Sequence, residues 1–295
     1  MSTNKTSMLC KLPWVLDPSD ADNRSHIITI LCLEIILALS AVILNASEII
    51  VIRKMFSQLG TAKEILLSLC VSDLLYGFIV LLADVVFKAL QISTGTFCLI
   101  AHLQADAALL LFLSSFLTLV LATGERYLCI IYPFFYERHC KSLVWSILLA
   151  CIWFLSICHP VLNHVGGIGH YVLFIAGFFI LSGCILIATA YLRIYYEAHK
   201  IRRSIQQQVA SIHGSQPRKR PSANMIAAVV VATLICYTPF AFNLFFIRLT
   251  DKSVSGKTAN WLFTLMSVNA TLNPICYCLL NKTLRQRFIR LWRRS

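Results

Sequence analysis

The sequence predicts an all-α membrane protein, a bundle of seven transmembrane helices followed by a short amphipathic eighth helix on the inner leaflet. Of its 295 residues, 58% are apolar and 13% are charged, whereas about a quarter of a soluble domain is charged. Apolar runs long enough to cross about 30 Å of hydrocarbon recur along the whole chain. The net charge of +13 is spread between these runs, which favours lipid head groups over nucleic acid as its partner.

Seven apolar runs, bounded by charged residues, Gly or Pro, define the transmembrane helices in order. The third and fifth runs are longer than a bilayer requires, so we expect their cytoplasmic ends to continue as helix beyond the hydrocarbon. The basic segment 199–222, with Pro217 and Pro221, is typical of a flexible loop. The runs are residues 27–52, 62–87, 98–130, 142–162, 171–196, 223–247 and 258–280.

Lys and Arg gather in alternate connecting segments, and this asymmetry predicts an amino terminus outside the cell and a carboxyl terminus in the cytoplasm. We therefore expect a multi-pass protein of the plasma membrane. It divides into an extracellular segment (1–26), a seven-helix membrane domain (27–280) and an amphipathic helix with a short cytoplasmic tail (281–295).

Both ends of the chain carry surface features. Asn4 and Asn23 begin Asn-x-Ser/Thr sequons in the outer segment and are candidates for glycosylation. After the seventh run, Leu284, Phe288 and Trp292 are interspersed with basic residues. That composition is typical of a helix lying on the inner membrane surface.

Polar side chains inside the apolar runs need a partner or a task, because polar groups in hydrocarbon are costly. Asn45, Asp73, Ser115, Asn269 and Asn273 lie in different runs or on separate turns and can converge near the middle of the membrane. One carboxylate among several neutral oxygens makes a plausible sodium site. A water-filled hydrogen-bond network without an ion explains the same spacing equally well.

Two motifs mark the cytoplasmic edge. Glu125-Arg126-Tyr127 closes the third run, and as a bare tripeptide it also fits an interfacial anchor. Asn273-Pro274-Ile275-Cys276-Tyr277 closes the seventh run at the same depth. Pro274 leaves a carbonyl unpaired and bends that helix, and a bent helix beside a polar interior can shift between two packings.

Taken together, these motifs resemble the rhodopsin-like (class A) family of G-protein-coupled receptors. The resemblance covers the chain from about Asn45 to Phe288. It implies an extracellular ligand, a heterotrimeric G protein as partner, no enzymatic activity, and no cofactor beyond a possible allosteric sodium ion. The motif residues are Asn45, Leu69 to Asp73, Glu125 to Tyr127, Trp153, Pro239 and Asn273 to Tyr277.

The resemblance also implies individual roles. Arg126 is similar to the arginine that meets the carboxyl-terminal helix of the G protein, and Tyr191 and Tyr277 to tyrosines that hold the open state through water. Phe134 resembles an inner-loop anchor on the G protein, although ordinary interfacial anchoring remains the alternative. The implied residues are Glu125, Arg126, Tyr127, Phe134, Tyr191 and Tyr277 for coupling, Tyr237, Pro239 and Pro274 for the toggle and hinges, and Asp73, Ser115, Asn269 and Asn273 for sodium.

Several positions depart from the family pattern. The second outer loop lacks the usual Cys, so Cys10 is the most obvious partner for Cys98, although both could be free thiols. Gly183 replaces a customary proline, and Tyr237 the customary tryptophan toggle. Lys219 stands near a usual acid, which predicts raised basal signalling. The short loop and missing proline are weakly similar to the melanocortin, lipid and adenosine branch.

Acidic residues in the outer halves of three consecutive runs suggest a cradle for a cationic peptide or small molecule. In the alternative interpretation, Asp84 pairs with Lys88 and Asp106 faces the loops. Ala108 at the family's amine-binding position argues against a monoamine, and a seventh run without lysine argues against retinal. The candidate pocket residues are Glu34, Asp84, Asp106, Ala108 and Tyr237.

Three other classes compete with a receptor. A transporter or channel predicts related halves and broken helices, and no half-repeat is visible. A zinc-dependent intramembrane hydrolase would need His159, His164 and His170 to converge, which their spacing around a Gly-rich loop does not favour. A receptor-like chain that serves only as a dimerisation partner remains open, as does a receptor dimer.

Overall fold

The computed structural model of the chain describes residues 16, 20–54, 62–93, 98–164, 169–213, 223–250, 255–280 and 282–292. Within these ranges every regular element is a helix, which confirms the expected all-α class. In chain order the elements are α1 (Ala21–Lys54), α2 (Ala62–Leu75), η1 (Tyr76–Leu81), α3 (Leu82–Ser93), α4 (Cys98–Ile131), α5 (Pro133–His139), α6 (Ser142–Asn163), α7 (Gly169–His213), α8 (Ala223–Thr250), α9 (Gly256–Leu280) and α10 (Lys282–Trp292).

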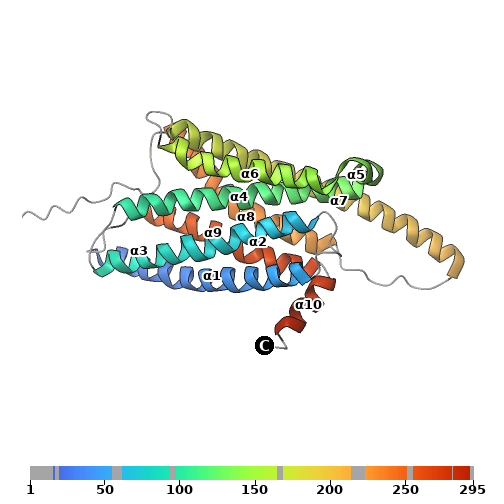
Figure 1. Cartoon of the computed structure of the whole chain (residues 1–295), viewed down its shortest axis with the longest axis horizontal. Helices are drawn as coiled ribbons and strands as arrows, with labels where there is room; N and C mark the ends of the chain where they lie inside the picture. The colour runs from blue at the N-terminus through green and yellow to red at the C-terminus, as the bar shows by residue number, and fades with distance from the viewer. Residues whose placement is uncertain are drawn as a thin grey trace, which may run out of the picture.

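The long helices run side by side as one bundle (Figure 1). In the part of the chain that is described, five helical stretches are long and apolar enough to cross a membrane, and α8 adds a shorter apolar stretch, Val231–Phe246. The 25-residue α9 completes the bundle by packing against α1 and α8. Counting α2, η1 and α3 as one span, these helices match the seven expected runs.

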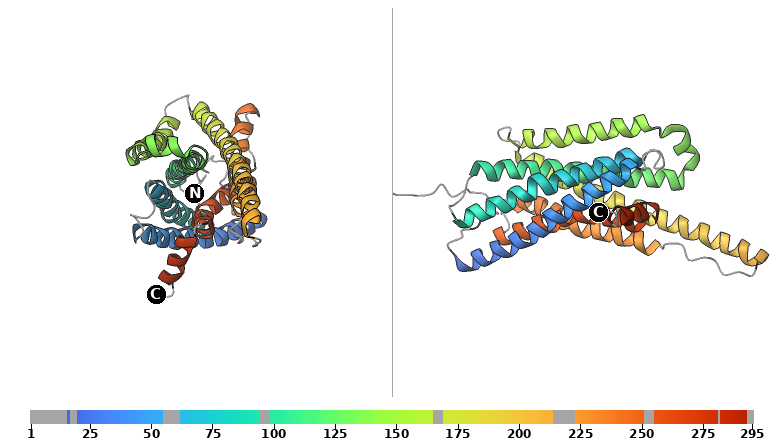
Figure 2. Two further views of the ribbon diagram at one scale, coloured as in Figure 1. Left: turned by 90° about the vertical axis from the view of Figure 1, so that its right-hand side faces the viewer. Right: turned by 60° about the horizontal axis from the view of Figure 1, so that its bottom comes forward.

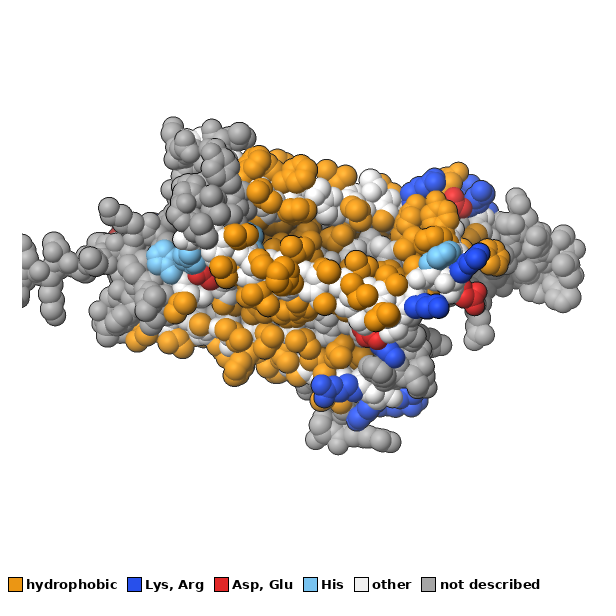
Figure 3. Space-filling model, turned by 45° about the horizontal axis from the view of Figure 1, so that its top comes forward, with side chains coloured by type: hydrophobic (Ala, Val, Ile, Leu, Met, Phe, Trp, Pro, Cys, Tyr) orange, Lys and Arg blue, Asp and Glu red, His pale blue; other side chains and the backbone are white. Residues whose placement is uncertain are grey.

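The outer surface of the bundle is apolar where lipid would cover it. Large hydrophobic side chains such as Ile36, Phe154 and Leu192 are exposed, and Figure 3 shows them as a broad band around the middle of the molecule. Lys and Arg side chains gather at one end of that band (Figure 3). A soluble monomer rarely exposes an apolar surface of this extent.

The second span contains a π-helical turn, η1, between α2 and α3. Gly77 lies in this turn against α1, where an added Cβ would come within 2.9 Å of the Ala41 Cβ. The missing side chain therefore lets the two helices approach closely. Because a π turn changes the rotation of the following helix, η1 sets the direction in which Asp84 and Lys88 of α3 project.

Two helix boundaries differ from expectation. The first helix begins at Ala21, where a carboxylate oxygen of Asp20 accepts the backbone N–H of Asp22 at 3.0 Å. The fifth helix runs to His213 and extends past its neighbours (Figure 2), so a loop from residue 199 is wrong over 199–213. Good helix formers such as Ile, Arg and Gln fill those residues, and Gly214 and Pro217 come only later.

Candidate functional site

A carboxyl group at the centre of the bundle links three spans. Asp73 of α2 is buried; the Ser115 hydroxyl of α4 donates to its Oδ1 at 2.7 Å, and the Asn273 amide of α9 donates to its Oδ2 at 2.7 Å. Three of the five polar side chains that were expected to converge are thus brought together. The side chains of Asp73, Ser115 and Asn273 are polar, and the core around them is apolar.

Tyr237 extends this polar layer to α8. The Asn269 amide donates to the Tyr237 hydroxyl oxygen at 2.6 Å, and Ser115 also hydrogen-bonds to Tyr237. Asn269 therefore reaches Asp73 only through Tyr237 and Ser115, and not by direct contact. We call Asp73, Ser115, Tyr237, Asn269 and Asn273 the polar core.

Asn45 does not join the polar core as expected. Its amide donates to the backbone carbonyl of Ala41 at 2.8 Å and to that of Ala270 at 2.9 Å. The second bond ties α1 to α9, so Asn45 holds two helices together. Its Oδ1 atom is buried without a hydrogen-bond partner.

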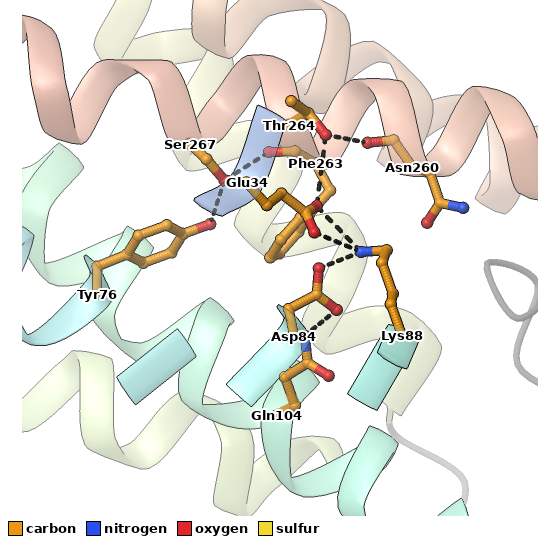
Figure 4. Close-up of polar contacts among 9 residues, drawn as sticks. All are labelled: Glu34, Tyr76, Asp84, Lys88, Gln104, Asn260, Phe263, Thr264 and Ser267. Atoms are coloured by element: carbon orange, nitrogen blue, oxygen red, sulfur yellow. Dashed lines mark hydrogen bonds and ion pairs between the residues drawn. The ribbon is translucent and has the colours of Figure 1, made fainter. Parts of the chain in front are cut away.

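A second polar cluster lies in the half of the bundle away from α5 and α10 (Figure 4). The Lys88 ammonium of α3 donates to both carboxylate oxygens of Glu34 in α1, at 3.0 and 2.8 Å, and also pairs with Asp84. The three side chains are 6%, 0% and 8% exposed, respectively. We call them the ionic cluster; with all three groups charged, it carries one net negative charge.

Neighbouring helices complete the surroundings of the ionic cluster. The Gln104 amide of α4 donates to Asp84, and the Thr264 hydroxyl of α9 lies 3.5 Å from Glu34 Oε1. The Lys88 ammonium is 6.0 Å from the centre of the Phe263 ring, within the range of a cation–π contact. Four spans therefore meet at these charges.

The geometry matches the alternative interpretation, in which Asp84 pairs with Lys88, in place of one open cradle lined by three acids. Lys88 lies one turn after Asp84 and turns inward, so its ammonium already occupies the space between Glu34 and Asp84 (Figure 4). Asp106 instead pairs with His164, with 2.6 Å between His164 Nε2 and Asp106 Oδ2. Ala108 is buried in the apolar core.

The cytoplasmic motif forms a small surface with α5. The Tyr136 hydroxyl donates to the buried Glu125 carboxylate, whose other oxygen lies 3.4 Å from Arg126 Nε. The Arg126 side chain is 48% exposed and Phe134 is 88% exposed. Glu125 is thus held by α5, while Arg126 and Phe134 remain accessible at the same end of the bundle.

The structure describes two further candidate tyrosines near this end of the bundle. Tyr191 of α7 hydrogen-bonds to Thr123 of α4, and Tyr127 packs edge to face with Tyr132. The side chain of Tyr277 lies outside the described residues, although its backbone belongs to α9. Lys219 also lies outside them.

Comparison with known proteins decides the family. A family model described as 7 transmembrane receptor (rhodopsin family) matches residues 49–170 and 167–277. The chain belongs to the rhodopsin family of seven-transmembrane receptors. It is similar to relaxin receptor 1 of Pongo abelii and of Homo sapiens, with 25% and 24% identity over 77% of the chain.

The relatives differ in the share of this chain that they match and in the share of their own length that is matched. The chain spans only 33% of the length of either relaxin receptor 1. The muscarinic acetylcholine receptor M5 of Rattus norvegicus is 34% identical over 71 residues, which are 24% of this chain and 13% of that protein. All of these proteins are receptors, so the receptor class is shared.

The receptor compensates for its missing proline in the fifth span. An added Cβ on Gly183 of α7 would lie 2.7 Å from two ring atoms of Phe116. The Phe116 ring, fully buried, occupies that space and packs 4.7 Å from the centre of the Tyr237 ring. Gly183, Phe116 and Tyr237 thus form one packed contact between α4, α7 and α8.

Glycosylation, the cysteine pairing and the hinge roles of the two prolines remain predictions. Asn4 and Cys10 lie outside the described residues, as does the side chain of Cys98, so no pairing is assigned. Asn23 lies in the first turn of α1. Pro239 and Pro274 are inside α8 and α9 as expected.

Two charged residues of the receptor have surroundings that the sequence pattern did not predict. Lys88 binds Glu34 as well as its expected partner Asp84. Glu48 of α1 is completely buried. A signal for Glu48 was present, because an ionisable residue within an apolar run is a functional candidate by default.

Proposed function

We propose that this receptor transduces binding of an extracellular ligand into activation of a heterotrimeric G protein. The observation that carries the proposal is the continuous polar core, which joins α2, α4, α8 and α9, and each of α8 and α9 contains a proline. A shift in any one of these helices must break or exchange a buried hydrogen bond. Such a layer favours two discrete packings over gradual deformation.

The proposed active packing opens the cytoplasmic end. α8, hinged at Pro239, moves outward and exposes Arg126 together with Phe134 to the G protein. The accessible positions of both side chains beside the immobilised Glu125 support this role. A ligand acts by binding the open packing more tightly than the closed one.

The proposed location is the plasma membrane, with the amino terminus outside and the carboxyl terminus inside. Exposed Arg53, Lys54 and Arg138 lie at the end of the bundle that carries α5 and α10. Basic residues of this kind are retained on the cytoplasmic side and contact anionic lipid there.

A sodium ion is proposed as an allosteric ligand of the closed packing. The polar core offers one carboxylate, two hydroxyl groups and two amide groups, all buried, and this hard oxygen set fits a monovalent cation better than a transition metal. Bound sodium would supply positive charge to the buried Asp73. Ser115 and Asn273 would hold the carboxylate in place.

The proposed extracellular ligand is a cationic peptide or small molecule. The ionic cluster contains two acidic side chains and one ammonium, so a cationic ligand that takes the place of Lys88 finds carboxyl groups on two spans to pair with. Lys88 would then be the internal competitor of the ligand. This departs from an open cradle, because binding must displace or rearrange an existing salt bridge.

A screen of cationic peptides and amines in cells carrying sensors for each G-protein class tests the proposal. An active ligand should give a wild-type response that Arg126→Ala abolishes at equal surface expression. Glu34→Gln should weaken that response and leave surface expression intact. Ligand binding without a response from any G-protein class would instead favour a non-signalling partner of another receptor.

A further inference from the structure

Glu48 of α1 is a buried carboxyl group that lacks a strong hydrogen-bond donor. Its exposure is 0%, neither Oε1 nor Oε2 accepts an N–H or O–H group, and the Cys70 thiol, a weak donor, is a side-chain hydrogen-bond partner. The Oδ1 atom of Asn45, three residues earlier on the same face of α1, is also buried and unpaired. Two acceptor groups therefore lie one turn apart, with a weakly donating thiol beside Glu48.

The surroundings of Glu48 offer little that could stabilise a negative charge. Val51 and Ile52, on the same face of α1, pack with Leu66 and Cys70 of α2 in one apolar cluster. Among the described residues, Glu48 interacts electrostatically with groups of α2 and α9 that are acidic or thiol, and with no cationic group. These groups are Cys70, Asp73 and Cys276.

A carboxylate in such a place must be neutralised, because an uncompensated charge in hydrocarbon is strongly unfavourable. A metal cation would need several oxygen ligands, and no three His, Cys, Asp or Glu side chains within the described ranges are arranged to hold one. A proton needs only the carboxylate. Protonation also turns Glu48 into an O–H donor, for which the unpaired Asn45 Oδ1 is an acceptor within one helical turn.

We propose that Glu48 is a proton-binding site of this receptor, which keeps its proton while α1, α2 and α9 stay in the present packing. When the helices separate and water enters, the carboxylic acid O–H bond breaks, the proton passes to water and a hydrated carboxylate remains. Cys276, the nearby group of α9, lies between Pro274 and Tyr277. Movement of α9 at its proline bend therefore changes the surroundings of Glu48 directly.

Infrared spectroscopy of the purified full-length receptor in lipid nanodiscs tests this site without any ligand or G protein, so its outcome is independent of the proposed signalling function. Subtracting the Glu48→Gln spectrum from the wild-type spectrum at neutral pH should leave the C=O band of a protonated carboxylic acid. The same band should remain in the spectrum of Asp73→Asn, which shows that it does not come from Asp73. The proposal would be overturned if Asp73→Asn lost the band and Glu48→Gln kept it. It would also be overturned if the difference between wild type and Glu48→Gln showed carboxylate bands instead.

Thermal unfolding provides a second readout with a matched control. The Tm of the wild type should fall as pH rises from about 5 to about 8, because the unfolded chain releases the Glu48 proton above about pH 4.3 whereas the folded receptor keeps it. Glu48→Gln, which stays neutral, should lose at least several degrees less over this range. Glu64→Gln, at a carboxylate that accepts hydrogen bonds from Ser142 and Ser146, should keep the wild-type dependence. Equal dependence in wild type and Glu48→Gln would contradict a proton at Glu48.

Discussion

The Asn273 amide donates a 2.7 Å hydrogen bond to Asp73 and thereby joins α9 to α2 at the centre of the receptor. Pro274 follows Asn273 directly, so the bond lies next to the proline inside α9. Any movement of α9 about this proline therefore changes the partners of the buried Asp73.

Asp73→Asn should remove the effect of sodium on the receptor. If sodium binds the polar core, replacing choline chloride by sodium chloride at equal ionic strength should raise the Tm of the wild type and leave that of Asp73→Asn unchanged. The neutral amide lacks the charge that would bind a cation. Glu64→Gln, which removes a carboxylate in the first turn of α2, should keep the sodium effect; a sodium effect that survives Asp73→Asn would count against the site.

Lys88→Met should destabilise the receptor by about 3–5 kcal/mol, because it leaves two carboxylates buried without their cation. Denaturant unfolding in lipid micelles measures the loss. Adding Glu34→Gln and Asp84→Asn to the same chain should restore most of it. Lys257→Met, which breaks the exposed pair with Asp22, should have little effect, and equal stability of the single and triple variants would refute the coupling.

Gly183→Ala should cost about 1–3 kcal/mol, the usual range for overpacking a core. The new methyl group would meet the Phe116 ring, which contacts Tyr237, so the free energy of unfolding and basal signalling should change together. Phe116→Leu in the same chain should relieve the clash. Gly124→Ala is the matched control, because an added Cβ there meets no atom within 4 Å; similar effects of the two alanines would argue against the packed contact.

Phe134→Ala should reduce G-protein activation and leave stability and surface expression unchanged. The ring is 88% exposed, so its removal takes away little packing within the receptor. Nucleotide exchange by the G protein, compared at equal receptor density, measures the effect. Phe135→Ala, at the neighbouring exposed ring that stacks on His139, is the control; unaltered exchange by Phe134→Ala would leave Phe134 as a membrane anchor.

The type of side chain was enough to predict part of the site from the sequence, whereas contacts that depend on the direction of the helices could not be predicted. Asp73, Ser115 and Asn273 could be grouped from sequence because buried polar groups must find one another within a bundle. The bond between Lys88 and Glu34 could not, since the partners are 54 residues apart and the η1 turn sets the direction of α3. Asn45 was assigned to the wrong partners because backbone carbonyls, which every residue has, compete with side chains for its amide.

The same reasoning applies to the fold. Apolar runs predicted the seven spans because the hydrocarbon thickness fixes helix length. They could not predict the end of α7, where a polar helix continues to His213 beyond the apolar run. The family pattern could not explain Gly183, because the reason lies in the Phe116 ring that occupies the space beside it.

The most direct test of the account is guanine-nucleotide exchange on purified G proteins of each class, with the receptor in nanodiscs and sodium replaced by choline to favour the open packing. We predict that the wild type accelerates exchange on at least one class, and that Arg126→Ala returns that rate to the value of empty nanodiscs. Equal rates for the wild type, Arg126→Ala and empty nanodiscs with every G-protein class would contradict coupling through Arg126.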